Sequence, residues 1–125
     1  MDSGKVQGKR ILLVDDEDGV RQTLKLLLRM DEHTVSEAVT GTDALELFLH
    51  GRFDLVITDY AMPKMRGDEL AVNIKRLAPS QPIIMITAHA ILAGKPGNPV
   101  DALLKKPFAF EDLRRSIAEV LSARQ

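Results

Sequence analysis

The sequence predicts an α/β domain built on a doubly wound parallel sheet. Three observations support this prediction: short apolar runs typical of buried strands, segments with helical apolar spacing, and regular alternation of the two along 125 residues. Strands that alternate with helices are joined by right-handed crossovers, which place helices on both faces of a parallel sheet. A chain of this length is expected to form one compact domain.

Five strands are expected. Ile11–Val14 and Leu55–Thr58 are short apolar runs typical of strands buried on both faces. Ile83–Thr87 is rich in β-branched residues, which favour strands. Thr34–Ala38 has mixed polarity and is expected at an edge of the sheet, and Ala102–Lys105 is a short last strand.

Helices are expected between the strands, where apolar residues recur at intervals of three and four. These stripes comprise Val20, Leu24, Leu27 and Leu28; Ala44, Leu45, Phe48 and Leu49; Leu70, Ile74 and Leu77; and Leu113, Ile117, Val120 and Leu121. Thr40 is expected to cap the second helix and Gly51 to end it, while Gly67 and Pro79 bound the third. Residues 91–99 contain two glycines and two prolines where a fourth helix is due, so that helix is expected to be shortened or irregular. The whole pattern suits a flavodoxin-like fold.

Composition excludes several classes of function. The absence of cysteine excludes disulfides, zinc–thiolate sites and thiol catalysis, and a reducing cytoplasm is the expected location. A net charge of −1 indicates neither direct nucleic-acid binding nor attraction to an anionic membrane. Apolar runs reach only about five residues, far fewer than the roughly 20 that span a bilayer. Residues 1–8 lack the apolar segment of a signal peptide and are expected to be a flexible lead-in to a domain at 9–125.

Polar residues follow the expected strands at their carboxyl ends. Asp15 and Asp16 follow the first strand, and Asp59 follows the third. Thr87 ends the fourth strand, and Lys106 follows the fifth. Ligands of open α/β sheets bind outside the carboxyl ends of the strands, so these five side chains are expected to converge at one edge.

Such a group suits metal-assisted phosphoryl transfer. Carboxylates that lie close together repel one another unless a hard cation takes their oxygens as ligands, and Mg²⁺ (or Mn²⁺) suits such a site. A carboxylate beside the metal can act as a nucleophile and form an acyl phosphate. Phosphoryl transfer needs mainly positioning and neutralisation of charge, which a metal ion and a lysine supply.

Each residue taken alone also has a structural explanation. Acids after a strand commonly cap a helix or lie in its first turn, where the helix dipole favours them, and Glu17 and Asp18 are expected to serve in this way. Asp59 alone fits a turn, Thr87 a strand end, and Lys106 a solvated surface. The conjunction favours a functional site, because acid, hydroxyl and base fall at the ends of different strands.

These residues resemble the receiver domains of two-component response regulators. The segments that carry the resemblance are ILLVDDE (11–17), DLVITDYAMPKMRGDEL (54–70), IIMITA (83–88) and KKPF (105–108). The resemblance covers Lys9 to about Leu121 and implies a five-stranded sheet of strand order 2-1-3-4-5. It further implies a signalling domain rather than an enzyme acting on other substrates, one that catalyses only its own phosphorylation and dephosphorylation.

The resemblance assigns a role to each site residue. Asp59 resembles the phosphoacceptor; Asp16 the direct metal ligand; Asp15 the acid that reaches the metal through water; Ala61 the position whose backbone carbonyl completes the metal site; Thr87 the switch hydroxyl; and Lys106 the lysine that pairs with the phosphoryl group. The Lys106–Pro107 bond resembles the cis peptide of the family. The implied phosphodonor is a sensor histidine kinase or a phosphotransfer protein, and a homodimer is a further expectation.

Three features depart from the family pattern. Leu103 stands where a switch aromatic is expected, so a shift of Thr87 is not coupled to burial of a ring in the usual way. The segment from Thr87 to Lys106 is slightly short and contains the glycines and prolines of 91–99. Ala61 and His89 stand at positions that tune dephosphorylation in the family; Ala61 has no side-chain group that orients water, and His89 is either such a group or an exposed loop residue.

Three other functions would suit parts of this pattern. A pseudo-receiver would bind partners without phosphorylation, but the full set of acids, hydroxyl and lysine argues against it. A haloacid-dehalogenase-like phosphatase would carry a second acid two residues after its nucleophile, where this chain has Ala61. A flavodoxin would follow its first strand with a phosphate-binding loop of small residues, whereas this strand is followed by DDED.

Overall fold

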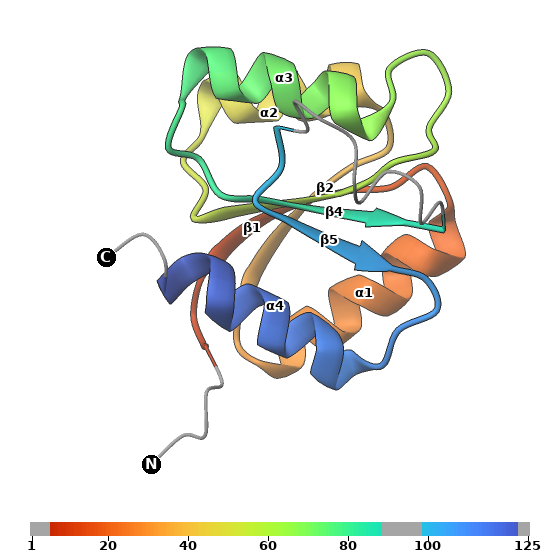
Figure 1. Cartoon of the computed structure of the whole chain (residues 1–125), viewed down its shortest axis with the longest axis vertical. Helices are drawn as coiled ribbons and strands as arrows, with labels where there is room; N and C mark the ends of the chain where they lie inside the picture. The colour runs from red at the N-terminus through yellow and green to blue at the C-terminus, as the bar shows by residue number, and fades with distance from the viewer. Residues whose placement is uncertain (1–5, 89–98, 123–125) are drawn as a thin grey trace.

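The fold is a five-stranded sheet between two pairs of helices, seen in a computed structural model that describes residues 6–88 and 99–122 (Figure 1). The strands are β1 (Arg10–Val14), β2 (Thr34–Ala38), β3 (Leu55–Asp59), β4 (Ile83–Thr87) and β5 (Ala102–Lys105). The described helices are α1 (Asp18–Met30), α2 (Gly41–His50), α3 (Gly67–Leu77) and α4 (Phe110–Ser122). The strands are parallel and lie in the order β2-β1-β3-β4-β5, which confirms the predicted topology.

The sheet separates two apolar layers. Figure 1 shows α2 and α3 on one face and α1 and α4 on the other. Side chains alternate along a strand, so Ile11 and Leu13 pack with α1 and α4, whereas Leu12 and Val14 pack with α2 and α3. β3 and β4 are buried along their whole length and β2 is only partly buried, which confirms the predicted central strands and edge strand.

The helix ends follow local hydrogen bonding. The predicted cap of α2 is confirmed, because the Thr40 hydroxyl accepts the Asp43 N–H at 3.0 Å. Glu17 occupies the N-cap position of α1, as expected, but its side chain makes no capping hydrogen bond. Asp15 instead accepts the Glu17 N–H at 2.9 Å, because its short side chain closes a turn two residues ahead. Asp18 lies in the first turn, as expected.

Two predictions fall largely outside the described residues. The segment expected to hold an irregular fourth helix includes residues 91–98, which are not described, and α4 is the predicted closing helix. The flexible lead-in at 1–8 also stays a prediction, since residues 1–5 are not described, while Val6 packs against the layer of α1 and α4. Across residues 6–88 and 99–122, no helix is long and apolar enough to cross a membrane.

Candidate functional site

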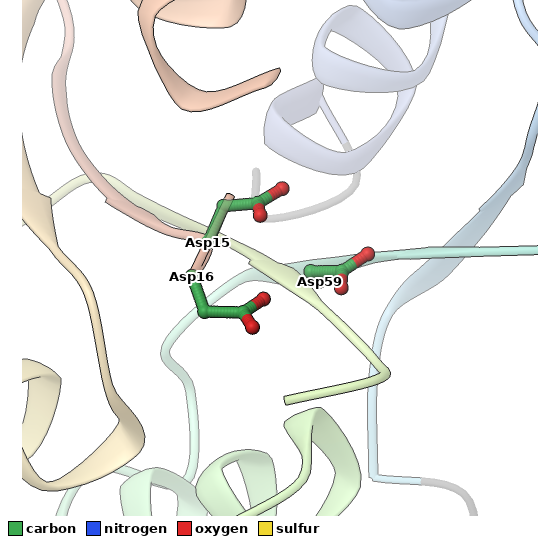
Figure 2. Close-up of side chains that lie close together, drawn as sticks. All are labelled: Asp15, Asp16 and Asp59. Atoms are coloured by element: carbon green, nitrogen blue, oxygen red, sulfur yellow. The ribbon is translucent and has the colours of Figure 1, made fainter. Parts of the chain in front are cut away.

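Three carboxylates meet at the carboxyl edge of the sheet. β1 and β3 are neighbours, and Val14 pairs with Thr58, so the residues that follow this pair emerge side by side. One oxygen from each of Asp15, Asp16 and Asp59 lies within 4.8 Å of the others. Figure 2 shows the three carboxylates turned toward the same side of this edge.

Burial and mutual repulsion make this cluster unfavourable as three free anions. Asp15 and Asp59 are buried and Asp16 is half-buried. Burial raises the pKa of Asp15 to about 6; the Glu17 N–H opposes the rise, and the nearby charges of Asp59 and Asp16 add to it. A hard divalent cation would offset this repulsion, and the donor set of three carboxylates within reach of one point fits Mg²⁺.

A lysine from the far edge of the sheet completes the cluster. The Lys106 Nζ lies 3.0 Å from the Asp59 Oδ1. The Lys106 N–H donates to the Thr87 carbonyl at 2.8 Å, which extends the β4–β5 ladder beyond Lys105 and fixes the backbone near the acids. The predicted cis Lys106–Pro107 bond is present. Burial lowers the pKa of Lys106, but the hydrogen bond and charge of Asp59 outweigh burial, so the pKa is raised and the ammonium stays charged.

The other predicted site residues lie at different distances from this centre. Thr87 is buried at the end of β4, which pairs directly with β3. Ala61 is exposed in the loop after Asp59, and Leu103 is half-buried on β5 opposite Met85. His89 lies outside the described residues. The functional roles of these four positions stay predictions.

Two residues that support the site were not singled out for it in the sequence. Gly67 begins α3 against the end of β3: a Cβ atom there would lie 2.3 Å from the Asp59 carbonyl oxygen. Arg21 is buried in α1, and its Nη1 donates to the Asp15 carbonyl at 2.9 Å. The sequence feature that could have indicated Arg21 is a charged residue on the apolar face of a helix. Arg21 lies three residues before Leu24 and seven before Leu28, both of which are buried in α1.

Comparisons with known proteins identify the family to which this fold belongs. The family model of the response regulator receiver domain matches residues 11–118, so the chain belongs to that family and is a receiver domain of two-component systems. Among curated proteins, it is 36% identical over 118 residues to the response regulator receiver protein CpdR of Brucella abortus (strain 2308), covering 92% of this chain and 98% of CpdR.

Longer relatives and solved structures match as well. The chain is 35% identical over 116 residues to the sensor kinase CckA of Brucella abortus, matching 89% of this chain but only 12% of CckA, and several other curated relatives are also much longer than the matched region. The crystal structure of response regulator TrrA from Thermotoga maritima in complex with Mg²⁺-BeF superposes with a TM-score of 0.84. TrrA is 34% identical to this chain, and the match covers 90% of this chain and 98% of TrrA.

Proposed function

We propose that this receiver domain accepts a phosphoryl group on Asp59 in a Mg²⁺-dependent reaction. The observation that carries the proposal is the meeting of the Asp15, Asp16 and Asp59 carboxylates with Lys106 3.0 Å from Asp59. The TrrA relative, which was solved in complex with Mg²⁺-BeF, adds support. A pseudo-receiver is not favoured, because the three acids lie together and the lysine contacts Asp59.

The chain's own groups supply most of the chemistry. An Asp59 carboxylate oxygen attacks phosphorus as the P–N bond of a phosphohistidine donor breaks. The electron pair of that bond leaves with the imidazole nitrogen, which takes up a proton from solvent. Lys106, whose ammonium already contacts Asp59, exchanges that contact for a phosphoryl oxygen and neutralises its charge.

Asp15, Asp16 and Asp59 would hold the metal, with the Ala61 backbone carbonyl as the further ligand that the family resemblance implies. When bound, Mg²⁺ supplies positive charge that offsets the carboxylates and the incoming phosphoryl oxygens. The Thr87 hydroxyl lies on the neighbouring strand and is the group we assign to a phosphoryl oxygen. Because Ala61 offers no side-chain group to orient water, we assign any such role in dephosphorylation to His89.

The donor we propose is a sensor histidine kinase or a phosphotransfer protein in the cytoplasm. Membership of the receiver family and the similarity to part of the sensor kinase CckA support this class of partner. The phosphorylated domain would signal by a conformational change that does not use an aromatic switch residue, because Leu103 occupies that position.

Intact-mass measurement tests the proposal directly. We expect the chain to gain the mass of one phosphoryl group when it is incubated with a small acyl or amido phosphate and Mg²⁺. Asp59→Asn should abolish the gain, whereas the control Asp43→Asn, at an exposed aspartate in the first turn of α2, should keep it. EDTA should block the reaction. A folded, metal-binding protein that gains no mass would favour the pseudo-receiver, and equal labelling in EDTA would refute the role of the metal.

A further inference from the structure

We infer that Arg21 is a positioning residue for the acid pair of Asp15 and Asp16. The inference rests on the proposed Mg²⁺ site and adds a residue that does not touch the metal ligands' carboxylate groups. Arg21 would act through the backbone: it holds the peptide from which both carboxylates project.

The Arg21 guanidinium uses all three of its nitrogens. Nη1 donates to the Asp15 carbonyl at 2.9 Å, Nε to the Glu37 carboxylate at 3.0 Å, and Nη2 to the Asp18 carboxylate at 2.7 Å. The side chain is only 9% exposed. A planar, forked group with several donors can hold such a set in one geometry, which a lysine ammonium cannot do as rigidly.

These bonds close a ring around Asp16. On one side, the Asp15 N–H donates to the Ala38 carbonyl of β2 at 3.1 Å, and the Asp15 carboxylate accepts the Glu17 N–H at 2.9 Å. On the other side, the Glu17 carbonyl accepts the Arg21 N–H at 2.9 Å. The Arg21 side chain then returns to the Asp15 carbonyl, so the backbone on both sides of Asp16 is fixed.

A purely structural role does not account for these contacts. Glu37 also accepts the Lys25 ammonium at 2.8 Å and the Gln22 amide at 3.1 Å, so α1 is joined to β2 without Arg21. Burying a guanidinium costs desolvation that a leucine at the same position of the α1 stripe would not incur. Of the three side-chain hydrogen bonds that Arg21 donates within the described part of the chain, the bond to the Asp15 carbonyl is the one that reaches the acid pair.

The test is a Mg²⁺ titration of the full chain. Tyr60, the single tyrosine in a chain without tryptophan, follows Asp59 and serves as the fluorescent probe. Groups that orient metal ligands typically contribute about 10–100-fold in metal affinity, so Arg21→Met should raise the Kd for Mg²⁺ by about tenfold or more. In the metal-free protein, the amide resonances of Asp16 and Glu17 should shift and exchange faster with solvent.

Two variants separate positioning from general stability. Arg114→Met removes an equally well-bonded guanidinium on α4, which donates to both carboxylate oxygens of Asp31 at 2.8 Å. This variant should leave the Kd within about twofold. Glu37→Gln removes a charge partner of Arg21 but leaves its bond to Asp15, and it should also leave the Kd within about twofold. Arg21→Lys, which keeps the charge and is expected to fold if the methionine variant does not, should give an intermediate loss.

The outcomes are distinct. An unmutated protein that binds no Mg²⁺ would overturn the proposed function, and this inference with it. If Arg21→Met and Arg21→Lys both bind Mg²⁺ as tightly as the unmutated protein does, the inference about Arg21 alone is overturned. Equal losses of affinity in Arg21→Met and Arg114→Met would likewise overturn it, because the effect would then follow stability rather than position.

Discussion

Replacing Gly67 by alanine should disturb the end of β3, which carries Asp59, more than the size of the change suggests. A Cβ atom at this position would lie 2.3 Å from the Asp59 carbonyl oxygen, 3.0 Å from the Tyr60 Cα and 3.1 Å from the Asp59 carbonyl carbon. All three atoms belong to the backbone, so no flexible side chain can move aside. Reaching even 3.0 Å requires the start of α3 or the end of β3 to move by about 0.7 Å (3.0 − 2.3).

The expected cost is set by two opposing effects. Overpacking a close contact costs about 1–3 kcal/mol. Alanine is favoured over glycine in a helix by about 0.5–1 kcal/mol, and this gain is smaller at the first residue of a helix. The free energy of unfolding should therefore fall by roughly 1–2 kcal/mol. Because misplacement by about 1 Å can cost a reaction about 100-fold, the phosphorylation rate of the folded protein should fall by about tenfold or more.

Urea unfolding followed by circular dichroism measures the first effect, and the time course of the mass gain measures the second. Gly19→Ala is the matched control, since no atom lies within 4 Å of a Cβ at that exposed position of α1. This variant should be unchanged or more stable by up to about 1 kcal/mol. Equal urea midpoints for Gly67→Ala and Gly19→Ala would refute the proposed close contact between α3 and Asp59.

Two further predictions follow from titratable groups. Burial raises the pKa of Asp15 from 3.8 to about 6, so Asp15→Asn should stabilise the metal-free protein at pH 7 by about 3 kcal/mol. This gain should shrink as pH falls from about 6 to 3.8 and be absent below 3.8, where the carboxyl is neutral in both the folded and the unfolded chain. The same variant should lose most of the rise in urea midpoint that Mg²⁺ gives the unmutated protein. A metal-free Asp15→Asn protein that is less stable than the unmutated protein at pH 7 would show that burial does not disfavour the Asp15 charge. Burial lowers the pKa of His33, whose Nδ1 accepts the Lys9 N–H at 3.0 Å. As pH falls through 6.5, this histidine therefore becomes protonated in the unfolded chain before it does so in the folded protein, and the folded protein loses stability. His33→Asn keeps an acceptor that does not titrate, and urea unfolding from about pH 7.5 to about pH 5 should show a smaller loss than in the unmutated protein.

The sequence alone determined the architecture and the edge where the site lies. Apolar runs such as Ile83–Thr87 specify buried strands, and periodic stripes specify helices, because these patterns depend on local geometry of period 2 and 3.6. Parallel strands bring their carboxyl ends to one edge whatever the details of packing, so Asp15, Asp16 and Asp59 had to converge there. Lys106 was predicted at the same edge by this reasoning and by resemblance to the family.

Only the tertiary structure decided how these groups support one another. The 3.0 Å contact between Lys106 and Asp59 depends on the register of β4 with β5. The Arg21 bond to the Asp15 carbonyl depends on how α1 packs, and the Gly67 contact depends on how closely α3 approaches β3. A local pattern records which face a residue occupies, whereas these contacts are fixed by the relative placement of whole elements, which depends on the packing of side chains far apart in the chain.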